Sequence, residues 1–455
     1  MDKRLPLLIR RAMYNLRGGF LVRPLTIALV LGCAGAALSW LEETFPAVSD
    51  LVPAALFPSH SDPQIAQVIL GGIAASIMTV VSIVFAILLM TLTLASMQFS
   101  PRIIVSFARD RVTQWTLGIF LGTFCYCMAA LPAARSLPHP FAPVATVFGA
   151  MFLALACVAW LLYFIHHISQ AISVSHIVDR IASETEAMID EMMPWPHRPG
   201  ALADPHLLEP ATWETPVVSQ ASGYIRYIDT NRLVALAKWY HVKVHVIRRV
   251  GHFVPAGTPL LMVHRGSRLS PEGCDQLLGA VDLGPSRTLQ QDIEFGVLQI
   301  VDIALKAISP AVNDPSTAIS CVDQLSRVLI RFASREPPSP LLYDPPGVVR
   351  VSIPWIDFYG LINSAFEQIR LYSKSDVAVS LRMLRALGDI ASTSGDPAYR
   401  RKLLEVGTRV MEGCLEKLGE EDVKAMRVRL AALEKLSNGI PAPDSELGLP
   451  EPYSQ

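Results

Sequence analysis

The chain has 455 residues and a formal net charge of −1, with 51% hydrophobic and only 17% charged residues. The near-zero charge argues against electrostatic binding of nucleic acid. The apolar excess lies between Leu25 and Ile168, whereas the second half has the composition of a soluble protein. The sequence therefore predicts a membrane half and a water-exposed half, and its length allows two or three domains.

The first 24 residues form a basic segment in which apolar side chains recur at helical spacing and arginines lie between them. This pattern favours an interfacial helix over residues 1–24, with its cations on anionic headgroups. An ordinary basic topology signal without a defined helix is the alternative.

Four long apolar segments follow, and they predict a four-helix transmembrane domain over residues 25–170. They cover residues 25–41, 68–97, 115–134 and 141–168. Each approaches or exceeds the ~20 apolar residues that cross a hydrocarbon core. Cations flank the first and third segments on their amino-terminal sides, while the intervening loops are acidic or nearly neutral. By the positive-inside rule, both termini of this multi-pass protein are expected in the cytoplasm.

The second segment carries a stripe of small and hydroxyl-bearing residues on one helical face. The stripe comprises Gly72, Ala75, Ser76, Thr79, Ser82, Ala86 and Thr93. Thirty helical residues would extend about 45 Å, which exceeds the hydrocarbon thickness of ~30 Å. We therefore take Ser76, Thr79, Ser82 and Thr93 as candidates either for close helix packing or for the lining of a narrow wet path.

Three arginines follow this segment at its predicted cytoplasmic end: Arg102, Arg109 and Arg111. They are candidates for a pore mouth or for contacts with lipid headgroups. The positive-inside signal explains most of the same charge without any further role.

Residues 171–216 predict a helix that continues out of the membrane and then a proline-rich linker. Residues 217–265 alternate apolar and polar side chains and predict a small β module. Within it, the run from Gly251 to Leu260 resembles half of a biotinyl- or lipoyl-type barrel, but Lys243 lies inside a strand pattern and is not expected to be an attachment site. His241 and His245 would share a strand face, yet surface histidines remain the default, and no metal site is assigned.

Residues 285–437 predict a mostly helical cytoplasmic domain, and residues 438–455 predict a disordered tail. A helical elbow is expected where one helix stops near Ser309 and another restarts at Pro315, with Asp314 as its N-cap. Asn313 and Asp314 are the candidate functional residues of this elbow, and capping explains them equally. The predicted fold is thus an α-helical membrane domain followed by an α+β domain with a small β-barrel-like module and a helical bundle.

The combination of these features resembles the bacterial predicted membrane protein family called domain of unknown function 2254. The resemblance rests on the four early spans, on residues 98–102 and 109–111, on the turn at residues 251–260, and on residues 302–315. It covers nearly the whole chain and implies a bacterial inner-membrane location. It supplies no activity and no functional residues.

No catalytic motif of the common hydrolase, nucleotide-binding or zinc-protease kinds occurs, so the sequence predicts no enzyme, no catalytic residue and no cofactor. No single charged residue lies in the middle of a span, which disfavours a proton relay. The remaining hypothesis is an oligomeric ion channel or pore with a cytoplasmic gating domain. The alternative is a membrane-anchored scaffold or sensor whose cytoplasmic domain binds a partner or a small ligand. The expected partners are the bilayer, further copies of the chain and ions, and not nucleic acid.

Overall fold

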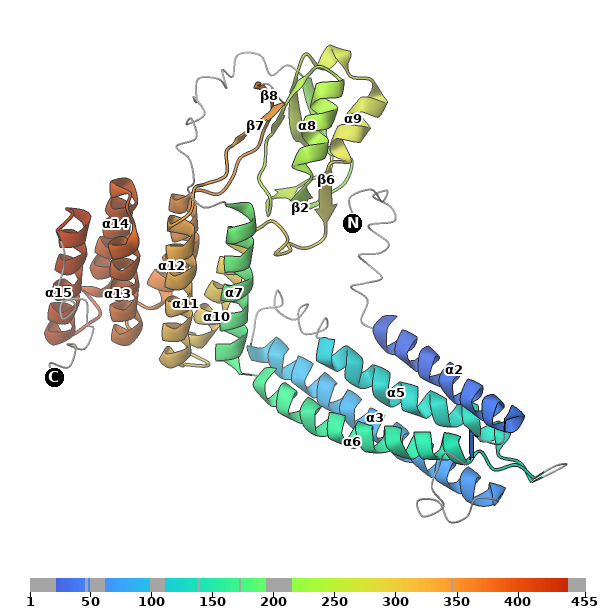
Figure 1. The fold of residues 1–455 in the computed structure, drawn as a ribbon. Coiled ribbons are helices and arrows are strands. Elements are labelled where there is room, and N and C mark those ends of the chain that lie inside the picture. Colours follow the sequence, from blue (N-terminus) through green and yellow to red (C-terminus); the bar gives the residue numbers. More distant parts are fainter. Residues whose placement is uncertain are drawn as a thin grey trace. The chain divides into compact units, whose positions relative to one another are not determined.

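The computed structural model describes residues 22–45, 48–49, 62–98, 111–136, 140–171, 173–193, 215–344 and 347–440. The chain separates into two compact units that meet in sequence between Ser173 and Val174. We call them the membrane unit and the C-terminal unit, and Figure 1 shows the elements of each. The interfacial helix expected at residues 1–24 lies almost wholly outside the described residues, as do the linker at 194–214 and the tail from residue 441.

The membrane unit consists of helices that are long and apolar enough to cross a bilayer, and four such helices occur among the described residues. They are α2 (Val22–Thr44), α3 (Pro63–Gln98), α5 (Arg111–Ala130) and α6 (Val144–Ala171). A short 3₁₀ turn, η2 (Leu131–Ala133), extends α5. The four spans predicted from the sequence are therefore confirmed as candidate membrane helices. Helices α2 and α3 are longer than their apolar runs, whereas α5 begins before its run and α6 begins after it.

Helix α5 is the centre of the membrane unit, because it packs on α2, α3 and α6 and half of its most apolar stretch is buried. Its contact with α2 depends on glycines. A Cβ atom on Gly35 of α2 would lie 2.6 Å from the Tyr126 carbonyl oxygen, and one on Gly122 would lie 2.5 Å from Leu31. Gly118 and Gly122 form the G-x-x-x-G spacing that lets membrane helices approach closely.

A buried carboxylate joins the end of α2 to the start of α6. Glu42, near the end of α2, is 0% exposed. Its oxygens accept hydrogen bonds from the backbone N–H groups of Ala145 and Thr146 at 2.8 and 3.1 Å, and from the hydroxyl groups of Thr146 and Ser49. Glu42 therefore caps the amino terminus of α6 from a different helix.

The C-terminal unit contains most of the remaining helices. They are α7 (Val174–Met192), α10 (Ile293–Ala307), α11 (Pro315–Ala333), α12 (Phe358–Tyr372), α13 (Val377–Thr393), α14 (Pro397–Cys414) and α15 (Glu420–Ser437). Asp292, Asp314, Asp357, Asp376 and Asp396 are N-caps whose side chains accept backbone N–H bonds. These caps explain why five of the helices begin where they do.

Helix α7 was expected to continue the last span, but α6 ends at Ala171 and α7 starts afresh at Val174 as part of the C-terminal unit. Its apolar face packs on α10 and α11. Arginines of α11 pair with its acidic face: Arg327 contacts Asp179 and Glu186, and Arg331 contacts Asp190. The helix is thereby fixed to the bundle on two sides.

The β module forms two open sheets and also contains helices that the sequence did not predict. The strands are β1 (Thr215–Val218), β2 (Gly223–Ile228), β3 (Lys243–Val246), β4 (Phe253–Val254), β5 (Pro259–His264), β6 (Val281–Gly284), β7 (Leu341–Asp344) and β8 (Val348–Ser352). One sheet has the order β1-β5-β3-β8-β7 and the other β4-β2-β6. No closed barrel is seen among the described strands, so the barrel-like expectation is not confirmed.

Two features changed the expected module. Helix α8 (Thr230–Trp239) interrupts what read as continuous strand, and helix α9 (Pro271–Leu278) follows beyond the predicted limits of the module. The apolar faces of both helices join the core under the sheets. Strand β8 pairs in parallel with β3, with Val244 opposite Val351. The module therefore includes a hairpin from beyond α11, outside the predicted limits of residues 217–265.

Candidate functional site

The hydroxyl stripe of α3 points away from the other membrane helices. Ser76, Thr79, Ser82 and Thr93 are all exposed. The opposite face of the same helix, which includes Leu70, Ile77 and Val84, is buried against α5 and α6. The structure thus brings the four predicted residues together on one face that no other described part of the chain covers.

The hydroxyl groups of Thr79, Ser82 and Thr93 each donate a hydrogen bond to a backbone carbonyl of α3 itself. Thr79 Oγ1 donates to the Ala75 carbonyl at 3.1 Å, Ser82 Oγ to Met78 at 3.0 Å, and Thr93 Oγ1 to Leu89 at 2.8 Å. The donors are therefore satisfied in an apolar setting. The oxygen lone pairs remain on the surface and can accept a hydrogen bond from water or from a neighbouring helix.

Small residues extend the stripe toward the amino terminus of α3. A Cβ atom on Gly71 or Gly72 would meet no described atom within 4 Å. In contrast, the glycines of α2 and α5 are filled by side chains and backbone of the partner helix. Small residues of the kind that allow α2 and α5 to pack closely are thus also present on α3, where no described helix packs against them.

The predicted pore-mouth arginines are described only in part. Arg111 is the first residue of α5 and is exposed. Arg102 and Arg109 lie outside the described residues.

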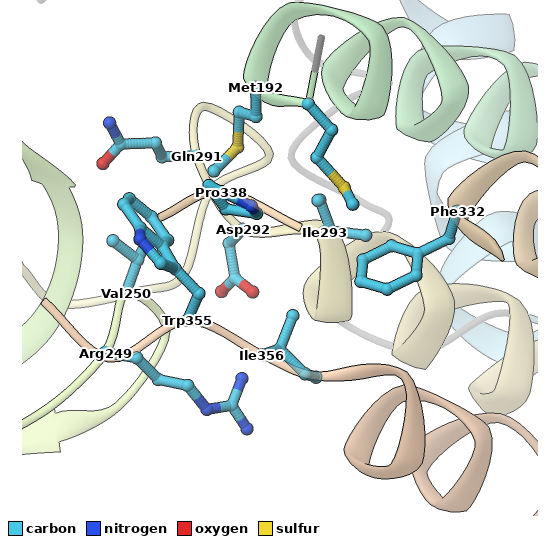
Figure 2. A pocket seen from close by; sticks show the side chains of 11 residues that line it. Met192, Arg249, Val250, Gln291, Asp292, Ile293, Phe332, Pro338, Trp355 and Ile356 are labelled. Carbon is cyan, nitrogen blue, oxygen red and sulfur yellow. The ribbon is translucent and has the colours of Figure 1, made fainter. Parts of the chain in front are cut away.

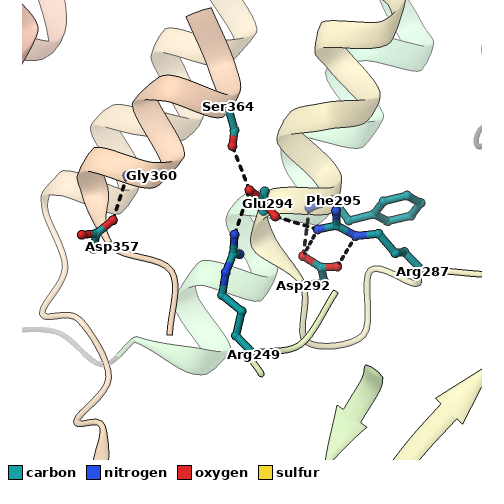
Figure 3. A network of polar contacts seen from close by, with 8 residues as sticks. All are labelled: Arg249, Arg287, Asp292, Glu294, Phe295, Asp357, Gly360 and Ser364. Atoms are coloured by element: carbon teal, nitrogen blue, oxygen red, sulfur yellow. Dashed lines mark hydrogen bonds and ion pairs between the residues drawn. The ribbon is translucent and has the colours of Figure 1, made fainter. Parts of the chain in front are cut away.

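The C-terminal unit contains a buried network of charges that sequence reasoning missed. Arg287 donates to both oxygens of Asp292, at 2.7 and 2.8 Å, and to Glu294 at 2.9 Å. Arg249 donates to the other oxygen of Glu294 at 3.0 Å, and Ser364 of α12 donates to that same oxygen at 2.8 Å. Figure 3 shows the two guanidinium groups reaching Glu294 from different sides.

This network carries two positive and two negative charges, so it has no surplus to offer a ligand. Burial alone would raise the pKa of Glu294, but the hydrogen bonds and charge of Arg249, with Ser364 and Arg287, lower it to about 2. The carboxylate is therefore ionised and fully engaged, which does not suit a general acid or base. Its position indicates a structural role, because it joins the β3–β4 loop, α10 and α12.

Gly251 makes this close approach possible. Its φ is +89°, a conformation that residues with a side chain rarely adopt. A Cβ atom there would lie 2.3 Å from Asp292 Oδ2 and 2.6 Å from Arg287 Nη2. The glycine of the predicted turn thus fits against the ion pair. The sequence pattern around it predicted a turn and gave no sign of the charges.

A small cavity of about 20 Å³ lies beside the network. Figure 2 shows Ile293 and Phe332 around one part of it and Met192 and Gln291 around another. The volume suits about one water molecule, far below the ~300 Å³ of a typical small-molecule pocket.

The helical elbow serves its own helix. Asp314 accepts hydrogen bonds from the backbone N–H of Thr317 at 3.1 Å and from the Thr317 hydroxyl. These bonds lower its pKa. Asn313 is exposed and has a φ of 49°, as a turn residue does. The capping interpretation accounts for both residues.

The two histidines expected to share a strand face do not. His241 lies in the turn after α8 with a φ of 52°, so only His245 belongs to β3. His245 Nδ1 lies 3.2 Å from the Ser352 hydroxyl across the parallel pair. Among the described residues, no group of three or more His, Cys, Asp or Glu side chains is placed to hold a metal ion.

Comparison with known proteins places the chain in a family. A family model described as "Predicted membrane protein (DUF2254)" matches residues 17–389. Uncharacterized proteins of Mycobacterium bovis and Mycobacterium tuberculosis are 32% identical over 432 residues, which is 93% of this chain and 81% of theirs. No solved structure matches. With this match and the four candidate membrane helices, the chain belongs to the DUF2254 family of predicted membrane proteins.

Proposed function

We propose that this chain forms an oligomeric ion-conducting pore in a bacterial inner membrane, with a cytoplasmic C-terminal unit that gates or filters it. The observation that supports this function best is the exposed hydroxyl stripe of α3, defined by Ser76, Thr79, Ser82 and Thr93. Small and hydroxyl-bearing residues do not stabilise a helix face that contacts only lipid. A helix that faces other copies and a water path gains from both its small size and its oxygen atoms.

The contrast with the rest of the membrane surface favours this proposal. The exposed residues of α6 include large apolar side chains such as Phe152, Leu155 and Leu162, each at least 66% exposed. On α3, the stripe alternates small groups with hydroxyl groups over several turns. The α3 face is thus the one suited to a second protein surface, and α6 is suited to lipid.

The predicted selectivity follows from the cations at the end of α3 and the start of α5. Arg111 is exposed, and Arg102 and Arg109 lie within the nine residues before it in sequence. In an oligomer, these arginines form a ring at the cytoplasmic mouth. A ring of cations favours anions over cations.

Conductance tests the proposal directly. Purified protein in planar bilayers is expected to give discrete currents, and Thr79→Leu or Ser82→Leu should reduce them because leucine fills the path and removes an oxygen. Val158→Leu on the lipid-facing side of α6, where Val158 is 59% exposed, is the matched control and should conduct as the wild type does. Arg102→Glu should shift the reversal potential toward cations. Absence of current over a wide range of voltage, pH and membrane tension would contradict the proposal.

Association is a separate prediction. The double variant Ser76→Leu with Ser82→Leu should dissociate at higher protein concentration than the wild type, since bulky side chains prevent close approach of α3 helices. The mass of the complex in mild detergent or nanodiscs measures this. A monomeric wild type would contradict the oligomer.

Topology is the third prediction of the proposal. Reporter fusions or cysteine labelling after Phe45 and after Leu137 should place both loops outside the cytoplasm. A cytoplasmic signal at either position would require a different arrangement of spans.

A scaffold or sensor remains the alternative function, and it is favoured by bulky aromatic residues exposed on the C-terminal unit. Trp239 is 78% exposed and Tyr372 is 71% exposed. Such residues are common anchors in protein interfaces. Recovery of one stoichiometric partner by the full chain, lost on Trp239→Ala or Tyr372→Ala, together with absence of current, would make this the better function.

A further inference from the structure

Three arginines gather where α13 packs between α11 and α15 in the C-terminal unit (Figure 1). Arg382 and Arg385 lie on α13, and Arg429 lies on α15. Arg429 Nη1 donates a hydrogen bond to the Leu381 carbonyl at 2.7 Å. Because Leu381 is one turn before Arg385, this bond brings the two guanidinium groups to the same side of α13.

The carboxylates nearby do not balance these charges. Arg382 is engaged with Asp323 of α11 through both of its oxygens. Arg385 reaches Asp389 only at 4.0 Å. Among the described residues, Arg429 forms no ion pair, so three cations face two carboxylates.

Two further features show that the positive charge of this cluster is not fully compensated, one at Arg429 and one at Arg385. Burial lowers the pKa of Arg429, and the charges of Arg385 and Arg382 lower it further. The Nε atom of Arg385 is buried and makes no hydrogen bond, and Asp389 Oδ2 lies 4.0 Å from it, beyond hydrogen-bond distance. A buried donor without a partner often marks the place of an ion or water molecule. A surplus positive charge beside it selects an anion.

We propose that a phosphate group binds between Arg385 and Arg429, with Arg382 adding charge from its pair with Asp323. Guanidinium groups match the oxygens of phosphate through paired N–H donors, which a point charge such as lysine does not. The side chain of Arg385 is 23% exposed, so it remains reachable from solvent. The phosphate comes either from a free anion or from a lipid headgroup, since both present non-bridging phosphate oxygens that guanidinium groups can bind.

The test uses the full chain in mild detergent, titrated with inorganic phosphate at constant ionic strength maintained with chloride. Calorimetry should give saturable binding, and the unfolding temperature should rise with phosphate. Arg429→Gln should weaken binding by about ten- to a hundredfold, the value of a hydrogen bond to a charged group. Arg427→Gln changes the same charge at an exposed position on the same helix and should bind as the wild type does.

The unfolding temperature measured without phosphate distinguishes a phosphate site from a purely structural role of Arg429. Glutamine at position 429 removes repulsion from Arg385, so the variant should unfold at the same temperature as the wild type or higher. If Arg429 only ties α15 to Leu381, the variant should be less stable by the same amount with and without phosphate. That result, or unchanged phosphate binding in Arg429→Gln, would overturn the site.

Short-chain phosphatidylglycerol below its micellar concentration distinguishes the two sources. Competition with inorganic phosphate in the wild type, absent in Arg429→Gln, identifies a headgroup as the ligand. Binding of inorganic phosphate without such competition identifies a free anion. A wild type that binds neither probe would overturn the proposal.

Discussion

Replacing Glu42 with alanine is expected to destabilise the membrane unit by about 3 kcal/mol, because a buried hydrogen-bonded charge is lost together with the cap of α6. Glu42 is fully buried, and its carboxylate accepts backbone N–H bonds from Ala145 and Thr146. Those two donors belong to the first turn of α6 and have no partner within their own helix. Without Glu42, they would stay buried and unsatisfied.

The adjacent Glu43 is the matched control. Its side chain is 41% exposed, and it pairs with Arg135, which is equally exposed. A pair of this kind contributes about 1 kcal/mol or less. Glu43→Ala should therefore change the stability little, although it removes the same charge one residue away.

Unfolding in detergent, followed by circular dichroism under increasing denaturant, measures both variants. Glu42→Gln should fall between alanine and the wild type, since the amide carbonyl oxygen of glutamine is kept as an acceptor. Equal losses for Glu42→Ala and Glu43→Ala would mean that charge at this end of α2, and not the cap, provides the stability.

The sequence predicted the helices well because their signals are local. Apolar runs identified the four candidate spans, and Asp314 followed by Pro315 marked the start of α11. Helix α13 begins at Val377 with Asp376 as its cap, which is again a local signal. Each of these features depends on residues within one or two turns of each other.

The β module could not be predicted to the same degree, because its pairing is long-range. Strand β8 lies beside β3 although more than a hundred residues separate Val244 from Val351. Alternation within a short segment also did not reveal α8, a helix of ten residues between β2 and β3. A period of two says which residues share a face and leaves open which strand is the neighbour.

The surroundings of the candidate site residues were equally hard to predict, because they also depend on residues distant in sequence. The helical period placed Ser76, Thr79 and Ser82 on one face of α3, but only the packing of α5 and α6 shows that this face is exposed. Nothing in the neighbouring sequence distinguishes Glu42 or Glu294 from the other acidic residues of the chain. Their partners come from segments 103 and 45 residues away in sequence, which no local pattern encodes.

Glu294 is the residue of the C-terminal unit whose substitution should have the largest effect. Its pKa is about 2 in the folded protein, against an ordinary value of 4.5. A carboxyl group with a lowered folded-state pKa stabilises the fold above its unfolded-state pKa. The difference of about 2.5 pH units corresponds to about 3 kcal/mol at neutral pH. Glu294→Gln should lose about that much, since Arg249 and Arg287 are left without the charge that they contact.

The pH profile makes this prediction specific. Above about pH 5.5, the free energy of unfolding of Glu294→Gln should lie below that of the wild type by a constant amount. As the pH falls from 4.5 toward 2, the wild type loses the contribution of Glu294, so the two profiles should converge. Denaturant unfolding of the full chain in detergent between pH 3 and pH 7 measures both. Glu412→Gln, at an exposed position on α14, is the control and should follow the wild type throughout. A difference that stays constant down to pH 3 would mean that the shape of Glu294, and not its ionisation, holds the network together.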